Sequence, residues 1–248
     1  MRKRIRVVVL LSLIALACAV AGCGSAQQPA SSDTSPTAVE ATGPQAQPTV
    51  AKKITMNGRS VMYNWMSHWG FSGEGAVKRN GYTIAYKELD ANDIAPSFAN
   101  NVSGLAPSSV TFFKFCFADF DGSNLATRQK EVEQVIATAK GRQLKLIIGN
   151  ALPVRKEDGS PEMVQEYRKY NAFLDRQAAS NQDVWVYDFY GVLAGPDGFL
   201  KPEYQTEDSH PNEKAYAVLD QSLFPLLDKV FAGQGQSSSP NRAHSAYP

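Results

Sequence analysis

A serine near the start of the chain and a histidine near its end have the types and neighbours that nucleophilic catalysis requires. Ser60 follows a short apolar segment and Gly58, which permits a tight turn. His210 follows two acidic residues, Glu207 and Asp208, at i−3 and i−2. A serine hydroxyl becomes a nucleophile when a histidine accepts its proton and a carboxylate orients that histidine. These residues predict acyl-transfer chemistry, with Glu207 or Asp208 as the acid. In the alternative interpretation Ser60 only caps a helix.

The sequence between these residues predicts the elements that position them. Five short apolar segments are typical of strands, at 53–57, 82–89, 110–117, 144–149 and 184–188. Apolar residues recur with helical spacing in three segments, at 126–140, 161–181 and 212–231. Alternating strands and helices form parallel sheets with right-handed crossovers, and continuous apolar strands indicate that helices cover both faces. We therefore expect a three-layer α/β/α fold with a parallel sheet of about five strands.

In such sheets, ligands bind beside the carboxyl ends of the strands. Ser60 follows the first predicted strand where a helix begins, so its own backbone N–H suits a developing anion. His210 precedes the last predicted helix, for which Asn212 has the residue type of an N-cap. The expected fold thus brings both side chains to one edge of the sheet.

An early Gly-x-Ser and a late acid-x-x-His-Pro, with alternating strands and helices between them, resemble the SGNH (GDSL-type) hydrolases. The resemblance extends from about residue 53 to residue 231 and is most specific at its two ends. It implies a flavodoxin-like fold and the hydrolysis of esters of sugars, lipids or small molecules. It also implies that Ser60 is the nucleophile and that His210 is the base.

Two departures from the family pattern lie beside these residues. Arg59 stands where the family has Asp before the nucleophile, so a cation replaces an anion. Glu207 stands three residues before His210 in place of the family's Asp, while Asp208 lies one residue closer. The choice of acid therefore stays open at this stage.

The donors of the oxyanion hole have no clean match. Residues 117–122 (Phe-Ala-Asp-Phe-Asp-Gly) stand where the family has Gly-x-Asn-Asp. We assign the hole to the backbone N–H of Ser60, with Gly104 and Asn150 as substitutes that come after predicted strands, and Asn92 as a further candidate. One such donor is worth about 2.7–4 kcal/mol in the transition state, so a catalytically inactive protein is an alternative.

The N-terminus predicts export. Four basic residues precede an apolar run at 7–20, which is shorter than the roughly 20 residues of a membrane-spanning helix but suits a signal peptide. Val20-Ala21-Gly22-Cys23 resembles the lipobox of bacterial lipoproteins, which implies that Cys23 is lipidated and becomes the mature N-terminus. The alternative is an ordinary secretory signal with an incidental Cys23. We expect a lipid anchor on the extracytoplasmic side of a bacterial membrane, in the cell envelope.

Composition divides the rest of the chain. We expect a signal peptide at 1–22, a disordered tether at 23–51 rich in Ala, Gln, Ser, Thr and Pro, a domain at 52–232 and a disordered tail at 233–248. The whole chain has 25 basic and 24 acidic residues, four of the basic ones before Cys23, so no strong positive charge points to nucleic acid. Cys116 lies in an apolar run, which predicts a small buried strand residue.

No residues have metal-ligand spacing and no Gly-rich loop suits a phosphate, so we expect neither a metal nor a cofactor. The aromatic residues after Ser60 indicate either a platform for a sugar ring or acyl chain or a part of the core: Tyr63, Trp65, Trp69 and Phe71. The sequence thus predicts a monomeric, membrane-anchored serine esterase that removes O-acyl groups from a glycan. The alternatives are an inactive SGNH-like lipoprotein that binds a glycan or a protein, and an O-acyltransferase.

Overall fold

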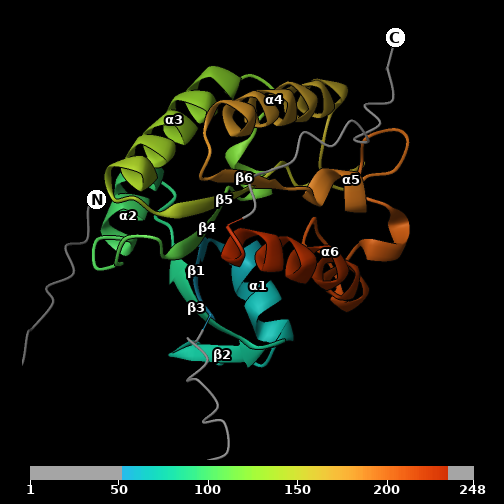
Figure 1. Ribbon diagram of the computed structural model, residues 1–248. Coiled ribbons are helices and arrows are strands. Elements are labelled where there is room, and N and C mark those ends of the chain that lie inside the picture. The colour runs from blue at the N-terminus through green and yellow to red at the C-terminus, as the bar shows by residue number, and fades with distance from the viewer. Residues whose placement is uncertain (1–51, 234–248) are drawn as a thin grey trace, which may run out of the picture. The chain divides into compact units, whose positions relative to one another are not determined.

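The central sheet has six strands in the order β2-β3-β1-β4-β5-β6 in the computed structural model, which describes residues 52–233 (Figure 1). Five strands pair in parallel, and β2 pairs antiparallel with β3 at one edge. The strands are β1 (Lys52–Gly58), β2 (Ala76–Arg79), β3 (Tyr82–Glu88), β4 (Val110–Lys114), β5 (Lys145–Gly149) and β6 (Val184–Tyr187). The α-helices are α1 (Ser60–His68), α2 (Ile94–Asn101), α3 (Leu125–Gly141), α4 (Pro161–Ser180), α5 (Phe189–Leu193) and α6 (Glu213–Phe231).

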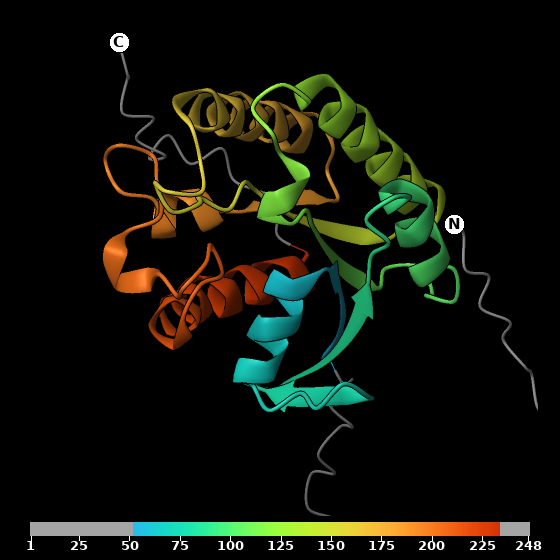
Figure 2. The same cartoon turned by 180° about the vertical axis from the view of Figure 1, so that it is seen from behind.

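Helices cover both faces of the sheet, as the continuous apolar strands predict. Successive residues of a strand point to opposite faces. Phe112 accordingly belongs to the core beneath α1 and α6, whereas Phe113 belongs to the core beneath α2, α3 and α4. Figures 1 and 2 show the two helix layers on either side of the sheet. The predicted three-layer α/β/α fold is confirmed.

The five predicted strands are confirmed, but one of them is shorter than predicted. The apolar run at 110–117 continues past the end of β4 at Lys114. The backbone N–H of Cys116 donates to Asp119 Oδ2 at 2.6 Å, which turns the chain into the 3₁₀ turn η1 (Phe117–Asp119). The strand β2 could not be predicted from the sequence, because this edge strand is largely exposed and lacks an apolar run.

Local capping fixes where two of the long helices begin. Asn212 Oδ1 accepts the N–H of Ala215 at 3.0 Å, so Asn212 is the N-cap of α6, as its residue type predicts. Ser160 Oγ accepts the N–H of Met163 at 3.3 Å before α4. A second 3₁₀ turn, η2 (Pro202–Tyr204), comes shortly before the His210 loop.

The predicted signal peptide (1–22), the tether (23–51) with Cys23, and the tail from residue 234 lie outside the described residues. Between residues 52 and 233, no helix combines the length and the apolar character needed to cross a bilayer.

Candidate active site

Ser60 lies at the carboxyl end of β1, where the strand order reverses. The parallel strands are ordered β3-β1-β4-β5-β6, so the chain passes from β1 to β3 on one side and then returns to β4 on the other side of β1. This topological switch point is where open α/β sheets bind their ligands. Gly58 ends β1, and a Cβ atom there would lie 2.2 Å from Met62 Cγ. The glycine therefore lets α1 begin directly after the strand, with Ser60 as its first residue and exposed.

The structure brings His210 to Ser60 from 150 residues away along the chain. His210 Nε2 lies 2.8 Å from Ser60 Oγ, and His210 Nδ1 lies 2.9 Å from Asp208 Oδ2. An ionised carboxylate only accepts hydrogen bonds, so His210 Nδ1 donates to Asp208 and Nε2 is left to accept the hydroxyl proton of Ser60. This is the arrangement of a nucleophile, a general base and an orienting acid.

Asp208, and not Glu207, contacts His210. Asp208 Oδ1 accepts the backbone N–H of His210 at 2.9 Å and the hydroxyl of Thr206 at 2.9 Å. The His210 backbone N–H is the main influence that lowers the pKa of Asp208 to about 2, and the side chains of His210 and Thr206 add to it. The carboxyl is therefore ionised at neutral pH, while Glu207 is exposed.

The neighbouring loop holds His210 in place. Ser209 is buried, and its hydroxyl donates to Asp158 Oδ2 at 2.7 Å and accepts the N–H of Arg155 at 3.1 Å. The Phe117 ring packs edge-on against the imidazole, with ring centroids 5.1 Å apart. The imidazole is therefore oriented by packing as well as by its hydrogen bonds.

The residues predicted for the oxyanion hole lie at different places in the fold. The N–H of Ser60 is in the first turn of α1, where backbone N–H groups have no acceptor within the helix. Gly104 lies after α2 and before β4, so it is at the amino ends of the strands, across the sheet from Ser60. Beside it, the carbonyl of Ser103 accepts Arg142 Nη1 at 2.6 Å, at the end of α3. The assignment of Gly104 to the oxyanion hole is wrong, because α2 returns the chain to the amino ends of the strands, away from Ser60.

Asn150 and Asn92 have structural partners instead. Asn150 is buried after β5, where Nδ2 donates to Asp188 Oδ1 at 2.6 Å and Oδ1 accepts the N–H of Tyr190 at 2.9 Å. It joins β5 to the turn after β6. Asn92 binds Asp90 within its own turn. Asn150 thus has a structural role that its position in the sequence did not predict.

Two contacts beside Ser60 were not predicted. Arg59 Nη1 lies 2.9 Å from Asp119 Oδ1. The cation that replaces the family's Asp before the nucleophile therefore pairs with an acidic residue of the segment at 117–122, which stands where the family has Gly-x-Asn-Asp. Burial raises the pKa of Asp119, and Arg59 is the strongest influence that opposes this shift. Cys116 is buried, as predicted, but lies beyond the strand with Sγ 3.9 Å from Ser60 Oγ. The opposite charges at positions 59 and 119 were the sequence signal for the first contact.

The aromatic residues in α1 and just after it divide between the core and the surface. Trp65 and Trp69 are buried, and their indole N–H groups donate to Asp220 at 2.9 and 3.0 Å. Phe71 is also buried. Tyr63 is 39% exposed and lies one helical turn after Ser60, on the same side of α1. A platform beside the nucleophile is thus limited to Tyr63.

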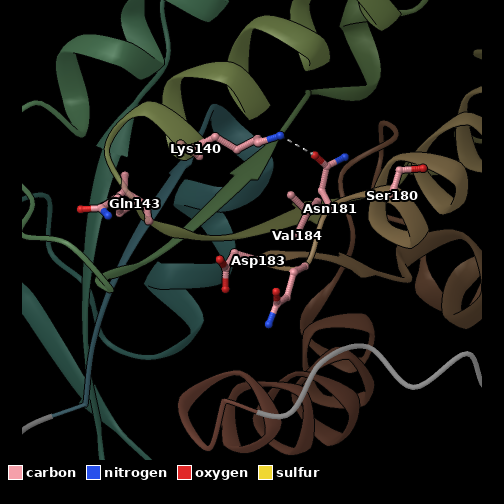
Figure 3. A pocket seen from close by; sticks show the side chains of 9 residues that line it. Lys140, Gln143, Ser180, Asn181, Asp183 and Val184 are labelled. Atoms are coloured by element: carbon pink, nitrogen blue, oxygen red, sulfur yellow. Dashed lines mark hydrogen bonds between the residues drawn. The ribbon is translucent and has the colours of Figure 1, made fainter.

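A hollow of about 400 Å³ opens at the amino ends of β5 and β6, at the opposite end of the strands from Ser60 (Figure 3). Its lining is mostly polar, and Lys140 Nζ donates to Asn181 Oδ1 at 3.3 Å across it. None of the residues assigned to catalysis lines this hollow. In the described part of the chain, no three His, Cys, Asp or Glu side chains gather in a way that could hold a metal ion.

The domain has the flavodoxin-like fold of the SGNH hydrolases. It is similar to a GDSL-like lipase from Bacteroides thetaiotaomicron, with 15% identity, a TM-score of 0.57, and 72% of this chain and 89% of that chain covered. A member of the lipolytic protein G-D-S-L family from Veillonella parvula has 17% identity and a TM-score of 0.50, with 71% and 98% covered. TesA has 12% identity and a TM-score of 0.51, with 72% and 99% covered. No protein-family model and no curated protein matches the chain.

Proposed function

We propose that the domain is a serine hydrolase that cleaves esters. The observation that carries this proposal is the line of hydrogen bonds from Ser60 through His210 to Asp208, with distances of 2.8 and 2.9 Å, at the switch point of the sheet. The fold shared with GDSL-like lipolytic proteins is consistent with it.

The reaction follows from the geometry. Ser60 Oγ attacks the carbonyl carbon of the ester while His210 Nε2 takes the hydroxyl proton, and Asp208 stabilises the imidazolium that forms. The tetrahedral intermediate collapses as His210 returns the proton to the leaving alcohol, which leaves an acyl group on Ser60. Water then repeats both steps and releases a carboxylic acid. With an alcohol in place of water, the same residues would carry out O-acyl transfer.

The substrate class we propose is an O-acylated glycan of the cell envelope or its surroundings. Tyr63 supports this choice, because it is exposed and lies one helical turn after the nucleophile. A tyrosine presents an apolar ring face with a polar end, which suits a sugar ring. The second candidate function is non-catalytic binding of a glycan or protein partner, which is favoured by the position of Gly104 at the amino ends of the strands and by the hydrogen bond from Asn150 Nδ2 to Asp188.

The test is active-site labelling combined with turnover. The full-length chain, purified in mild detergent, is treated with a fluorophosphonate probe and assayed with a short activated ester. We expect the probe to modify Ser60, and mass spectrometry would identify the labelled residue. Ser60→Ala should lose labelling, and its turnover should fall by about 10³-fold or more. His210→Ala should do the same. Equal turnover by wild type and Ser60→Ala, or a wild type that neither reacts nor turns over, would favour the binding protein.

We also propose that the mature protein is lipid-anchored through Cys23. Two or more acyl chains hold a protein at a bilayer, because each buried CH₂ contributes about 0.8 kcal/mol. We therefore expect Cys23→Ala to move the protein from the membrane fraction to the soluble fraction after cell lysis. Cys18→Ala is the matched control and should stay in the membrane fraction, since Cys18 lies in the segment that is removed. A Cys23→Ala protein that sediments with membranes would contradict lipidation.

A further inference from the structure

An ion pair connects the two loops that border Ser60. Arg59 directly precedes the nucleophile as the N-cap residue of α1, and Asp119 ends the η1 turn after β4. Their side chains meet at 2.9 Å and are 19% and 6% exposed. The guanidinium is therefore held next to the N-terminus of α1, close to solvent, on the side where η1 approaches the nucleophile.

The start of the η1 turn, with Cys116 just before it, contacts both side chains of the proposed Ser60–His210 pair. Cys116 Sγ lies 3.9 Å from Ser60 Oγ, and the Phe117 ring packs against the imidazole of His210. Asp119, two residues after Phe117, directs Arg59 toward this turn. The guanidinium thus lies between the backbone at Ser60 and the loop after β4, where the family pattern has a Gly-x-Asn-Asp.

Hydrogen bonds hold Asp119, the carboxylate that pairs with the guanidinium. Lys114 Nζ donates to the carbonyl of Phe115 at 2.6 Å. The N–H of the same peptide group, at Cys116, donates to Asp119 Oδ2 at 2.6 Å, and Asp119 Oδ1 forms the ion pair with Arg59. Both carboxylate oxygens of Asp119 are therefore occupied. Oxyanion donors are most effective when the protein holds them rigidly in this way.

Arg59 has donors to spare. A guanidinium carries five N–H groups in a planar fork, and the ion pair with Asp119 joins one of its nitrogens, Nη1. A buried ion pair is by itself weak evidence for a stabilising role, because desolvation offsets its attraction. A catalytic role explains why a cation stands beside the nucleophile here.

We propose that Arg59 is a catalytic residue that donates a hydrogen bond to the oxyanion of the tetrahedral intermediate, together with the backbone N–H of Ser60. The proposal rests on the proposed ester hydrolysis. Gly104 lies at the amino ends of the strands, opposite Ser60, and the side chain of Asn150 is hydrogen-bonded to Asp188 and Tyr190, so we assign the second donor to Arg59. Arg59 keeps its protons throughout: its positive charge stabilises the negative oxygen while the carbonyl carbon is tetrahedral, and the hydrogen bond weakens when the carbonyl re-forms.

The experiment is chemical rescue. We expect Arg59→Ala to lower kcat for a short activated ester by about 10²–10³-fold, with little change in KM. Guanidinium chloride, added well below the concentrations that unfold proteins, should raise the kcat of Arg59→Ala by at least about tenfold. It should restore nothing in Ser60→Ala. Arg59→Lys should lie between wild type and Arg59→Ala, because an ammonium donates but lacks the fork.

Arg142→Ala is the matched control, since it removes an arginine that binds a backbone carbonyl at the opposite edge of the sheet. We expect it to have the kcat of wild type and no response to guanidinium. Wild-type kcat in Arg59→Ala would overturn the proposal and leave the proposed function intact. A loss of kcat that guanidinium does not restore would also overturn it, and would assign Arg59 to structure. An inert wild type would overturn the proposed function and this proposal together.

Discussion

Asp208→Asn is expected to lower kcat for ester hydrolysis by about 10²–10⁴-fold with little change in KM. Asp208 Oδ2 accepts from His210 Nδ1 at 2.9 Å, so the carboxylate selects the tautomer in which Nε2 is free to accept the proton of Ser60. An amide at position 208 that donates to Nδ1 would favour the other tautomer and would give no charge to balance the imidazolium. Turnover of an activated ester by purified wild type and variant measures the effect.

Glu207→Gln is the matched control, because it makes the same change of a carboxylate into an amide one residue earlier. Glu207 is exposed, so we expect its variant to stay within about twofold of wild type. The reverse result, with Glu207→Gln inactive and Asp208→Asn active, would show that the loop rearranges when substrate binds.

The same contact fixes the expected pH dependence. The pKa of Asp208 is lowered to about 2, chiefly by the backbone N–H of His210, so Asp208 stays ionised well below neutral pH. Protonation of Asp208 therefore contributes nothing to any fall in kcat/KM between neutral pH and about pH 4, and a profile of kcat/KM against pH measures this. Any stability that the Asp208 contacts add is present above about pH 4 and is lost only as the pH falls toward 2.

The sequence predicted the layers of the fold because they depend on a local property. Parallel strands covered on both faces are continuous apolar runs, and β4 and β6 are buried at every position. The same rule failed at the ends and edges. β2 is exposed and gives no apolar run, while the run after β4 continues into η1, where a hydrogen bond from Cys116 to Asp119 bends the chain.

The side chains of the proposed triad were predictable to different degrees for a related reason. Ser60 and His210 each stand in a local pattern, next to a strand end and a helix start, and the parallel topology brings those positions together. The choice between Glu207 and Asp208 depends on the backbone of one loop, where the N–H of His210 turns back onto Asp208. The prediction for Gly104 was wrong because a helix, α2, lies between β3 and this residue. The helix returns the chain to the amino ends of the strands, so Gly104 lies at the opposite end of the strands from Ser60.

Beneath the site, a lysine is buried where a charge is costly. Lys114 is 1% exposed at the end of β4, with Nζ 2.6 Å from the carbonyl of Phe115 and 5.1 Å from the centre of the Phe189 ring. Gly149 on the neighbouring strand makes room for it, since a Cβ there would lie 2.4 Å from Lys114 Cδ. Burial lowers the pKa of Lys114 to about 8, although the nearby Asp119 and Cys116 oppose the shift.

This shift predicts a pH dependence of stability with a definite sign. A folded-state pKa of about 8, against 10.5 for the free side chain, means that the unfolded chain binds more protons between these values. The free energy of unfolding therefore gains a contribution as the pH rises from 8, by about 1–2 kcal/mol up to pH 9.5. The window ends there because buried tyrosines with raised pKa values, such as Tyr187, oppose folding at higher pH.

Lys114→Met should remove this contribution, because the thioether side chain has similar length and no charge. Urea unfolding at pH 8 and pH 9.5 measures the contribution. Between these two pH values the free energy of unfolding of wild type should rise by about 1–2 kcal/mol relative to that of Lys114→Met. Lys130→Met is the matched control, since Lys130 is exposed on α3, and its curve should run parallel to wild type. Parallel curves for wild type and Lys114→Met would mean that Lys114 keeps an ordinary proton affinity, and that the charge at the end of β4 is solvated when the protein is folded.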